Sequence, residues 1–260
     1  MAHQDSSPDK GPLRKIDEAV IASRRTRRYR AAAFQTYVFV ASGVFLTLAV
    51  VAHWVAYFPV DLRITRALQA YHGAPFARLM YDVSWLGFPP QVFVICLFTA
   101  GLVLSFGLRW ESLVCLFAEG GVIIGALVKL VVVRPRPSAD LVHVFAQLHS
   151  SGFPSGHVLE FTCFAGFLGF LTFTLVKPSA GRSIVMAALG VLILLMGLSR
   201  IYQGQHWFSD VCGAYLLGSV WLALSIKLYR WGKPKFFVRQ PVAPEVPEQG
   251  SARVATASSG

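Results

Sequence analysis

Residues 154–177 read PSGHVLEFTCFAGFLGFLTFTLVK, a polar start followed by an apolar run long enough to cross a membrane as a helix. Ser155 is a good helix cap, and Gly156 lets a ligand approach the backbone. The free N–H groups and the dipole at a helix start favour an anion. The stretch therefore predicts a membrane-spanning helix with a polar, anion-binding N-terminus.

Five other apolar segments have a comparable length, which gives six predicted spans. They are residues 34–58, 90–107, 110–133, 156–177, 183–201 and 208–230, of which the second is the shortest. The chain of 260 residues has 55% hydrophobic and 14% charged residues and a mean hydropathy of +0.55. Soluble domains carry about 25% charged residues. We therefore expect an all-α, polytopic membrane protein with a six-transmembrane-helix bundle.

The segment that joins the first two predicted spans has a helical apolar pattern of its own. Ile64 and Leu68 follow this spacing, Gly73 and Pro75 interrupt it, and it then resumes. Two short interfacial helices between residues 61 and 89 fit the pattern. We expect them to cap the bundle or to shape a lateral entrance for a lipid.

The distribution of basic residues predicts the orientation of the spans. Eight precede the first span, two flank the turn between the fourth and fifth spans, and five follow the last span. These are Lys10, Arg14, Lys15, Arg24, Arg25, Arg27, Arg28, Arg30, Lys177, Arg182, Lys227, Arg230, Lys233, Lys235 and Arg239. Six spans place all of them on one side, which we expect to be the cytoplasm.

We divide the chain into three parts on this basis. Residues 1–30 are expected to form a basic, partly disordered cytoplasmic tail, with disorder up to about Val20, and residues 31–233 the six-span domain. Residues 234–260 are expected to form a disordered cytoplasmic tail. No cleaved signal peptide is expected, and the first apolar segment should act as an uncleaved anchor. The basic run before it fixes the orientation, contacts anionic lipids, or does both.

The net charge of +11 does not point to nucleic acid, because the positive residues concentrate in the N-terminal tail and at span ends. The four cysteines, Cys96, Cys115, Cys163 and Cys212, all lie inside apolar segments. No pair of them has metal-site spacing, and single buried thiols behave as small apolar residues. We expect no nucleic-acid partner, no disulfide and no zinc site.

Two more polar stretches carry residue types that handle phosphate. Lys129 is followed after six residues by Arg136 and Pro137, and Arg200 is followed by His206 and Asp210. In the predicted topology these stretches and the start of residues 154–177 all border span ends on the non-cytoplasmic side. We therefore expect three separate motifs to converge on one face of the bundle.

The histidines in these stretches permit nucleophilic and acid–base chemistry. A carboxylate four residues from a histidine on a helix can fix its tautomer, which would leave one nitrogen of His206 as a nucleophile beside Asp210. The alternative is a purely local hydrogen bond. His157 could protonate a leaving oxygen, or it could be an interfacial histidine at a capped helix start.

The cations of the three stretches suit a phosphate group. Arginine matches phosphate oxygens through its planar fork, and lysine adds a point charge. The alternative is that Lys129, Arg136 and Arg200 mark membrane boundaries, where long basic side chains extend toward water. Phosphoryl transfer needs a nucleophile, an acid and complementary positive charge, and the three stretches together supply all of these.

The patterns Lys-x6-Arg-Pro, Pro-Ser-Gly-His and Ser-Arg-x5-His-x3-Asp, which span residues 129–210, resemble the type 2 phosphatidic acid phosphatase family. The same signature occurs in vanadium haloperoxidases and bacterial acid phosphatases. The resemblance implies that His206 attacks phosphorus to form a phosphohistidine and that Asp210 orients it. It implies that His157 protonates the leaving group and then activates water. The implied phosphate ligands are Lys129, Arg136, Ser155, Gly156 and Arg200, with no metal and no cofactor.

The same resemblance implies a membrane lipid as substrate, bound from the bilayer at the outer face of a plasma or inner membrane. An isoprenoid diphosphate such as undecaprenyl diphosphate is favoured, with phosphatidylglycerol phosphate and phosphatidic acid as alternatives. A lipid phosphotransferase is a second enzymatic reading, and a non-catalytic lipid-binding protein or transporter is the rival from another class. A haloperoxidase is not expected, and the sequence leaves the oligomeric state open.

Three charged residues lie outside the signature. Glu160, one turn beyond His157, is expected either to pair with a site cation or to hydrogen-bond within the bundle. Glu119 lies near mid-membrane, about 15 Å along the helix axis from Lys129, so a direct pair between them is not expected. Arg134 is a candidate contact for a second phosphate.

Overall fold

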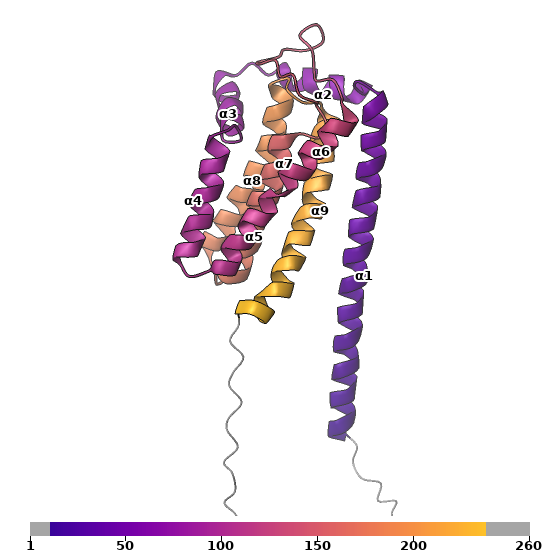
Figure 1. The fold of residues 1–260 in the computed structure, drawn as a ribbon, viewed down its shortest axis with the longest axis vertical. Helices are drawn as coiled ribbons and strands as arrows, with labels where there is room; N and C mark the ends of the chain where they lie inside the picture. Colours follow the sequence, from indigo (N-terminus) through magenta and orange to yellow (C-terminus); the bar gives the residue numbers. More distant parts are fainter. Residues whose placement is uncertain (1–10, 238–260) are drawn as a thin grey trace, which may run out of the picture.

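The computed structural model describes residues 11–237, in which all regular secondary structure is helical and there is no strand, and this confirms the all-α prediction. The α-helices are α1 (Gly11–Trp54), α2 (Pro59–Gln69), α3 (Ala74–Trp85), α4 (Gln91–Ser105), α5 (Arg109–Glu119), α6 (Gly121–Val132), α7 (Gly156–Leu175), α8 (Ala180–Tyr202) and α9 (Phe208–Gly232). Figure 1 shows most of them running along one direction, with α2 and α3 at one end of the bundle.

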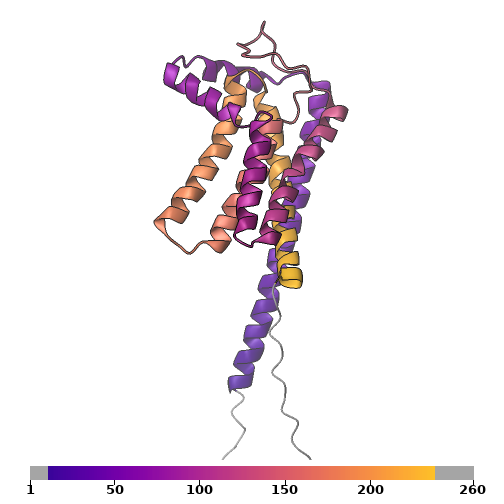
Figure 2. The same cartoon turned by 60° about the vertical axis from the view of Figure 1, so that its left-hand side comes forward.

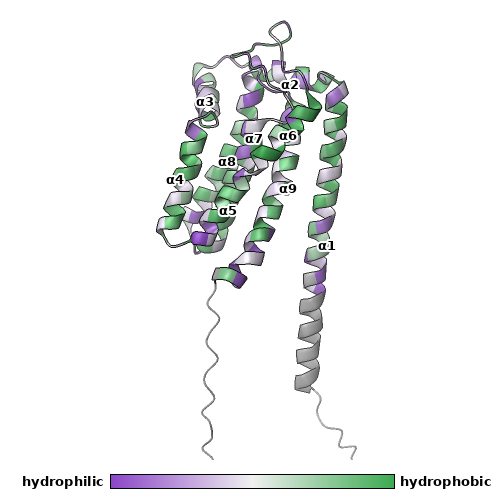
Figure 3. Cartoon of the chain, viewed as in Figure 1, coloured by the Kyte–Doolittle hydropathy of each residue, from purple (hydrophilic) through white to green (hydrophobic). Residues whose placement is uncertain are grey.

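The surface of this bundle is that of a multi-pass membrane protein. Five helical segments are long and apolar enough to span a membrane: Arg28–Trp54, Arg109–Val132, Gly156–Leu175, Ala180–Tyr202 and Phe208–Phe236. Large apolar side chains such as Phe98 and Leu130 point outward and are 69% and 76% exposed. Figure 3 shows apolar residues along the length of the helices. Such a surface is stable only against lipid.

The prediction of six spans is not confirmed, because the second predicted span is short. Helix α4 has 15 residues, which corresponds to about 22 Å, whereas the hydrocarbon core of a bilayer is about 30 Å thick. It runs alongside the other helices in Figures 1 and 2. The sixth span therefore stays a prediction, and so does the orientation that depends on an even count.

The third predicted span is a single segment by length, but it is broken into α5 and α6 at Gly120. A Cβ added at Gly121 would come within 2.9 Å of both the Cys163 sulfur and the Trp221 ring. Two adjacent glycines weaken a helix, and here they also let it approach α7 and α9. The span predicted over residues 110–133 is therefore present at Arg109–Val132, but as two helices.

The N-terminal segment differs from the expectation of disorder up to about Val20. Helix α1 begins at Gly11 and continues to Trp54, so the part of that segment within the described residues is helical. Residues 1–10 and 238–260, which include most of the predicted C-terminal tail, lie outside the described residues. The first predicted span ends at Trp54 instead of residue 58, because Pro59 starts α2 and disfavours helix in the residue before it.

Helix α7 lies in the interior of the bundle and packs against α5, α6, α8 and α9. Small residues permit this approach: a Cβ at Gly218 in α9 would come within 2.9 Å of the Thr162 side chain in α7. The main apolar core joins α7 to α8 and α9 through side chains such as Leu159, Met196 and Val211. Close packing of these three helices fixes the relative positions of their ends.

The ends of four helices meet where α2 and α3 cover the bundle. Helices α6 and α8 finish there, and α7 and α9 begin there, with residues 133–155 as the longest connection (Figure 1). Both α2 and α3, predicted as interfacial helices, are confirmed as helices, and each buries polar groups against the bundle, Asp61 from α2 and Ser84 from α3. This end of the molecule carries the predicted phosphate-handling residues.

Candidate active site

Hydrogen bonds connect the three sequence motifs directly. The guanidinium Nη1 of Arg136 lies 3.0 Å from Nε2 of His206, which links the first motif to the third. The backbone N–H of Ser155 donates to the backbone carbonyl of Asp210 at 3.2 Å, which links the second to the third. Lys129 donates from Nζ to the Ser151 carbonyl at 2.9 Å. The expected convergence of the motifs is therefore present in the structure.

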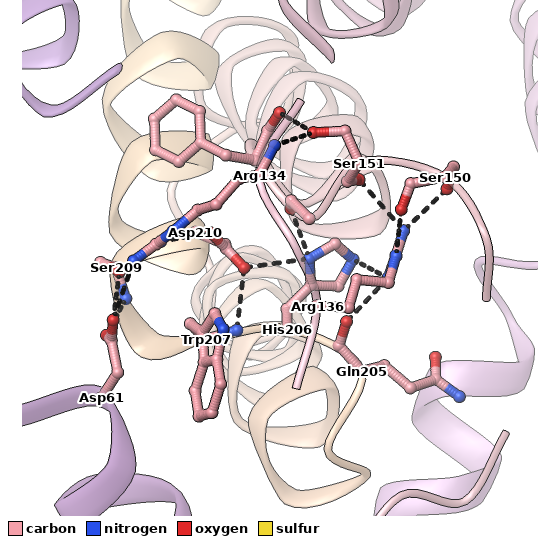
Figure 4. A network of polar contacts seen from close by, with 12 residues as sticks. Asp61, Arg134, Arg136, Ser150, Ser151, Gln205, His206, Trp207, Ser209 and Asp210 are labelled. Carbon is pink, nitrogen blue, oxygen red and sulfur yellow. Dashed lines mark hydrogen bonds and ion pairs between the residues drawn. The ribbon is translucent and has the colours of Figure 1, made fainter. Parts of the chain in front are cut away.

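His206 is held in one tautomer by two neighbours (Figure 4). Its Nδ1 lies 2.7 Å from the carbonyl oxygen of Gly152, which can only accept a hydrogen bond. Its Nε2 faces Arg136, which is always protonated and can only donate. The ring proton is therefore on Nδ1 and the lone pair is on Nε2, which is the arrangement that a nucleophilic histidine requires.

Asp210 supports His206 less directly than expected. One of its carboxylate oxygens accepts from Arg134 at 2.6 Å, and the other accepts from the backbone N–H of Trp207 at 2.9 Å. The second oxygen lies 3.6 Å from Nδ1 of His206, beyond normal hydrogen-bond distance. The carboxylate thus acts on the imidazole through its charge, while the Gly152 carbonyl accepts the Nδ1 proton.

Burial and neighbouring charge keep His206 neutral. The side chain is almost completely buried, and this burial holds its pKa well below the ordinary value of 6.5. The positive charges of Arg136, Arg200 and Lys129 lower that pKa further, whereas the hydrogen bond to Gly152 opposes the shift. Burial also lowers the pKa of Arg136, and the charge of Asp210 partly offsets this. The imidazole therefore keeps its free lone pair at neutral pH.

His157 lies on α7 against the turn that joins α3 and α4. Its ring meets Phe88 edge to face with centroids 4.6 Å apart, and a Cβ added at Gly87 would overlap the ring. It interacts electrostatically with His206, Arg200, Arg136 and Lys129, so it lies beside the same cluster. The position fits a second histidine that flanks a bound phosphate.

Arg200 reaches the site from the last turn of α8. It is fully buried, donates to the Ser84 hydroxyl and lies over the Phe88 ring, with its Cζ 5.2 Å from the centroid. Residues of α3 and of the turn after it thus form one wall of the site. The sequence motifs gave no sign of Ser84, Gly87 or Phe88, because their contribution depends on contacts across more than 60 residues.

Three buried polar atoms of the predicted site have no hydrogen-bond partner within residues 11–237: Ser155 Oγ, His157 Nε2 and Arg200 Nε. Ser155 occupies the cap position of α7, but its side chain makes no capping hydrogen bond. Buried polar groups without partners are rare and costly in folded proteins. These three atoms lie beside one cluster of cations, and an anionic ligand bound there could supply their missing hydrogen-bond partners.

Arg134 does not take the role expected for it. Its guanidinium is buried between Asp61 and Asp210 and also donates to Ser209, so it offers no contact to a second phosphate. The preceding residue, Val133, ends α6 in the left-handed region with φ of 45°, a conformation that β-branched residues rarely adopt. Sequence reasoning missed Asp61 and Ser209, whose only signal was an acidic residue at the start of α2.

The two intramembrane glutamates lie together, away from the site cations. Potential ligand atoms of Cys96, Glu119 and Glu160 lie within 4.8 Å of one another, on α4, α5 and α7. The alternative in which Glu160 pairs with a site cation is therefore wrong. This is the one group of three possible metal ligands found within the described residues, and it shares no residue with the phosphate-handling cluster. All four cysteines are free, as expected.

Similarity to known proteins covers the region that carries the three motifs. Residues 108–234 match the sequence model of the PAP2 superfamily. The chain is 28% identical over 177 residues to Phosphatidylglycerophosphatase B of Bacillus subtilis (strain 168), which covers 67% of this chain and 85% of that protein. These matches and the membrane-spanning helices define a membrane-embedded phosphatase.

Solved structures extend the comparison to the fold. The crystal structure of a transmembrane PAP2-type phosphatidylglycerolphosphate phosphatase from Bacillus subtilis superposes with a TM-score of 0.66 at 25% identity, over 77% of this chain and 98% of that one. LpxE of Aquifex aeolicus gives a TM-score of 0.49 at 22% identity, over 65% and 96%. Residues 108–234 of the chain are thus similar in sequence to the PAP2 superfamily, and its fold is similar to that of a transmembrane PAP2-type phosphatase.

Proposed function

We propose that this protein hydrolyses a phosphate monoester on a membrane lipid, with phosphatidylglycerol phosphate as the first candidate. The observation that carries the proposal is the buried, neutral His206, whose Nε2 lone pair faces Arg136 within a cluster of cations. Its Nδ1 proton is held by the Gly152 carbonyl. A nitrogen prepared in this way can attack phosphorus without an external base.

The reaction has two steps that balance. In the first, Nε2 of His206 bonds to phosphorus, the bond from phosphorus to the lipid oxygen breaks, and His157, which starts as the imidazolium, gives that oxygen a proton. In the second, His157 takes a proton from water, the water oxygen bonds to phosphorus, and the bond to Nε2 breaks. The products are the lipid alcohol and inorganic phosphate, and both histidines return to their starting states.

The phosphate oxygens are held by charge and by backbone groups. Lys129, Arg136 and Arg200 supply the positive charge, and the Ser155 hydroxyl and the N–H groups at the start of α7 complete the binding site. Both Ser155 Oγ and Arg200 Nε lack a partner among residues 11–237, which supports their use by a ligand. In this proposal no metal ion takes part in either step.

A monoester is preferred here to the isoprenoid diphosphate that the sequence resemblance favoured. Arg134, the candidate contact for a second phosphate, is committed to two carboxylates and cannot reach a ligand. The relative and the first solved structure reported above, both from Bacillus subtilis, are also named as phosphatases of phosphatidylglycerol phosphate. Undecaprenyl diphosphate and phosphatidic acid are the second and third candidates.

We place the site at the outer face of a plasma or inner membrane. The active-site end of the bundle is opposite the end where α1 begins and α9 finishes (Figure 1). Basic residues such as Arg28, Arg30 and Lys233 lie toward that second end, and basic residues favour the cytoplasm. The lipid tails would remain in the bilayer while the headgroup enters the site.

Two rival functions make different predictions. A lipid phosphotransferase would form the same phosphohistidine but pass the phosphoryl group to a second lipid. A binding protein or transporter would need the cations but not a histidine fixed in one tautomer. The geometry of His206 therefore favours catalysis over binding alone.

The test is a phosphate-release assay on the detergent-purified full chain. It compares phosphatidylglycerol phosphate, undecaprenyl diphosphate, phosphatidic acid and a water-soluble monoester for the wild type, His206→Ala and His72→Ala. His72 is exposed in the turn between α2 and α3 and serves as the matched control. We expect phosphatidylglycerol phosphate to give the highest kcat/KM, His206→Ala to lose turnover by orders of magnitude and His72→Ala to keep it. Equal turnover by wild type and His206→Ala would refute the proposal.

A further inference from the structure

A buried arginine links the interfacial helix α2 to the candidate nucleophile. The guanidinium of Arg134 lies 3.1 Å from Asp61 and 2.6 Å from Asp210, and all three side chains are completely buried. Asp61 belongs to α2, outside residues 108–234 that match the family. Figure 4 shows the three side chains in a row that ends at His206.

Asp61 is bound on every side within this network. One carboxylate oxygen accepts from the backbone N–H of Ser209 at 2.8 Å. The other accepts from the Ser209 hydroxyl at 2.7 Å, the Phe58 N–H at 2.9 Å and Arg134 at 3.1 Å. A carboxylate with four donors is fixed in orientation. It therefore presents a rigid negative charge to Arg134.

Arg134 contacts both groups that face Nδ1 of His206, namely Asp210 and Gly152. Its side chain donates to Asp210, whose other oxygen lies 3.6 Å from Nδ1. Its backbone carbonyl accepts from the N–H of Gly152 at 2.7 Å, and the Gly152 carbonyl faces Nδ1 at 2.7 Å. Its Nε also donates to the carbonyls of Val55 and Ala56, between α1 and α2. One residue thus supports both groups that lie on the Nδ1 side of the His206 ring.

The structure assigns to Asp61 the role of a positioning residue for His206, acting through Arg134 on Asp210 and Gly152. The inference rests on the proposed function, because it needs His206 to be the nucleophile. Asp61 touches neither phosphate nor the reacting nitrogen. Its contribution is to hold one edge of the Arg134 guanidinium, so that Arg134 contacts one carboxylate oxygen of Asp210 and the other oxygen faces the imidazole.

Replacing Asp61 by asparagine removes the charge while keeping the shape. Arg134 is then paired with Asp210 alone, so the guanidinium shifts toward that carboxylate and away from the α2 side. A buried charge that loses one partner is strongly unfavourable, and the network must rearrange. Removing a residue that orients a functional group without contacting the substrate typically lowers activity by about 10- to 100-fold.

The effect should fall on kcat and spare binding. The proposed phosphate-binding side chains, Lys129, Arg136 and Arg200, make no hydrogen bond or ion pair with Asp61. We expect Asp61→Asn to lower kcat about 10- to 100-fold and to leave KM and the inhibition constant for vanadate close to wild type. Asp61→Glu keeps the charge and should recover part of the loss.

The experiment measures kcat, KM and vanadate inhibition for Asp61→Asn, Asp61→Glu and a control, Asp82→Asn. Asp82 is an exposed aspartate on the neighbouring helix α3, paired only with Arg78. Ser209→Ala is the second variant, in case Asp61→Asn does not fold, because it cuts the hydroxyl bridge between Asp61 and Arg134. The Asp210→Asn single and double variants complete a cycle in which the two carboxylates should be strongly non-additive.

The outcomes separate this inference from the proposed function. If the wild type releases phosphate and His206→Ala does not, while folded Asp61→Asn and Ser209→Ala both keep full kcat, only the positioning role is overturned. Equal losses in kcat and in vanadate affinity would also overturn it, because they would indicate a collapsed phosphate site. If the wild type hydrolyses no lipid and forms no phosphohistidine, the proposed function itself fails.

Discussion

A single methyl group at Gly87 should slow catalysis by displacing His157. Gly87 lies in the turn between α3 and α4, and a Cβ there would overlap Cδ2 of the His157 ring and lie 3.2 Å from Nε2. Ordinary van der Waals contact begins at 3.4 Å, so the ring must move by about 1 Å. The Phe88 ring, 4.6 Å away, blocks a simple rotation in place.

The size of the effect follows from the role proposed for His157. Positioned acid–base groups contribute about 100- to 10,000-fold, and a misplacement of about 1 Å can cost about 100-fold. We therefore expect Gly87→Ala to lower kcat about 100-fold, equivalent to about 2.7 kcal/mol in the barrier. KM should change little, because Gly87 contacts His157 and none of the side chains proposed to bind the phosphate.

The assay compares a lipid monoester with 4-nitrophenyl phosphate and traps the phosphoenzyme by acid-free denaturation, which preserves phosphohistidine. The nitrophenolate needs little protonation to leave, so the first step should survive in Gly87→Ala. The second step still needs His157 to activate water. Phosphohistidine should therefore accumulate with 4-nitrophenyl phosphate, which a general loss of folding would not produce.

Gly101→Ala on α4 is the matched control, because a Cβ at Gly101 meets nothing within 4 Å. The reasoning is refuted if Gly87→Ala has the thermal stability and kcat of the wild type. A loss confined to KM would also contradict it, because the overlap would then act on substrate entry and not on the histidine.

Three further results are expected. Burial and nearby cations hold the pKa of His206 below 6.5, so activity should persist as the pH falls through 6.5. An acid limb of kcat/KM centred at 6.5 or above would contradict this. The stability of the protein should decline below pH 6.5, because His206 takes up a proton more readily in the unfolded chain than in the folded one. Glu160→Gln should keep kcat near wild type, since its carboxylate faces Cys96 and Glu119; a loss by orders of magnitude would place it in the mechanism. Excess EDTA should leave phosphate release intact and vanadate should inhibit it, whereas complete loss on chelation that Mg²⁺ restores would show that the cations of the chain are insufficient.

The fold and the main polar residues were accessible from sequence because a membrane simplifies both problems. Long apolar segments fix the spans, and alternation of the spans decides which ends lie together. Lys129, His157 and His206 come from separate regions, yet each borders the end of a span. Their convergence was therefore predicted from the number of spans between them. The break at Gly120 was not accessible, because a glycine pair inside an apolar run is compatible with either a continuous or a broken helix.

The remaining parts of the site could not be predicted because they depend on backbone groups and on contacts distant in sequence. The partner of His206 Nδ1 is a carbonyl oxygen, that of Gly152, and every residue has one. Asp61 and Arg134 are 73 residues apart, and nothing in either local sequence indicates the other. Arg134 was predicted to contact a second phosphate for the same reason, because the sequence does not show in which direction an arginine beside a phosphate-binding motif points.

Charge balance connects the buried network to the choice of substrate. The cluster holds four cationic side chains and two carboxylates, namely Lys129, Arg134, Arg136 and Arg200 against Asp61 and Asp210. With His206 neutral, this leaves a net charge of +2, apart from the proton that His157 passes to the leaving oxygen. A phosphate monoester carries about −1.5 to −2 near neutral pH, so it would neutralise the site almost completely. A diphosphate would add negative charge without a further cation to meet it, because Arg134 is already paired with Asp61 and Asp210. The two carboxylates therefore do more than orient a histidine, since they also limit how much anionic charge the buried site can accept.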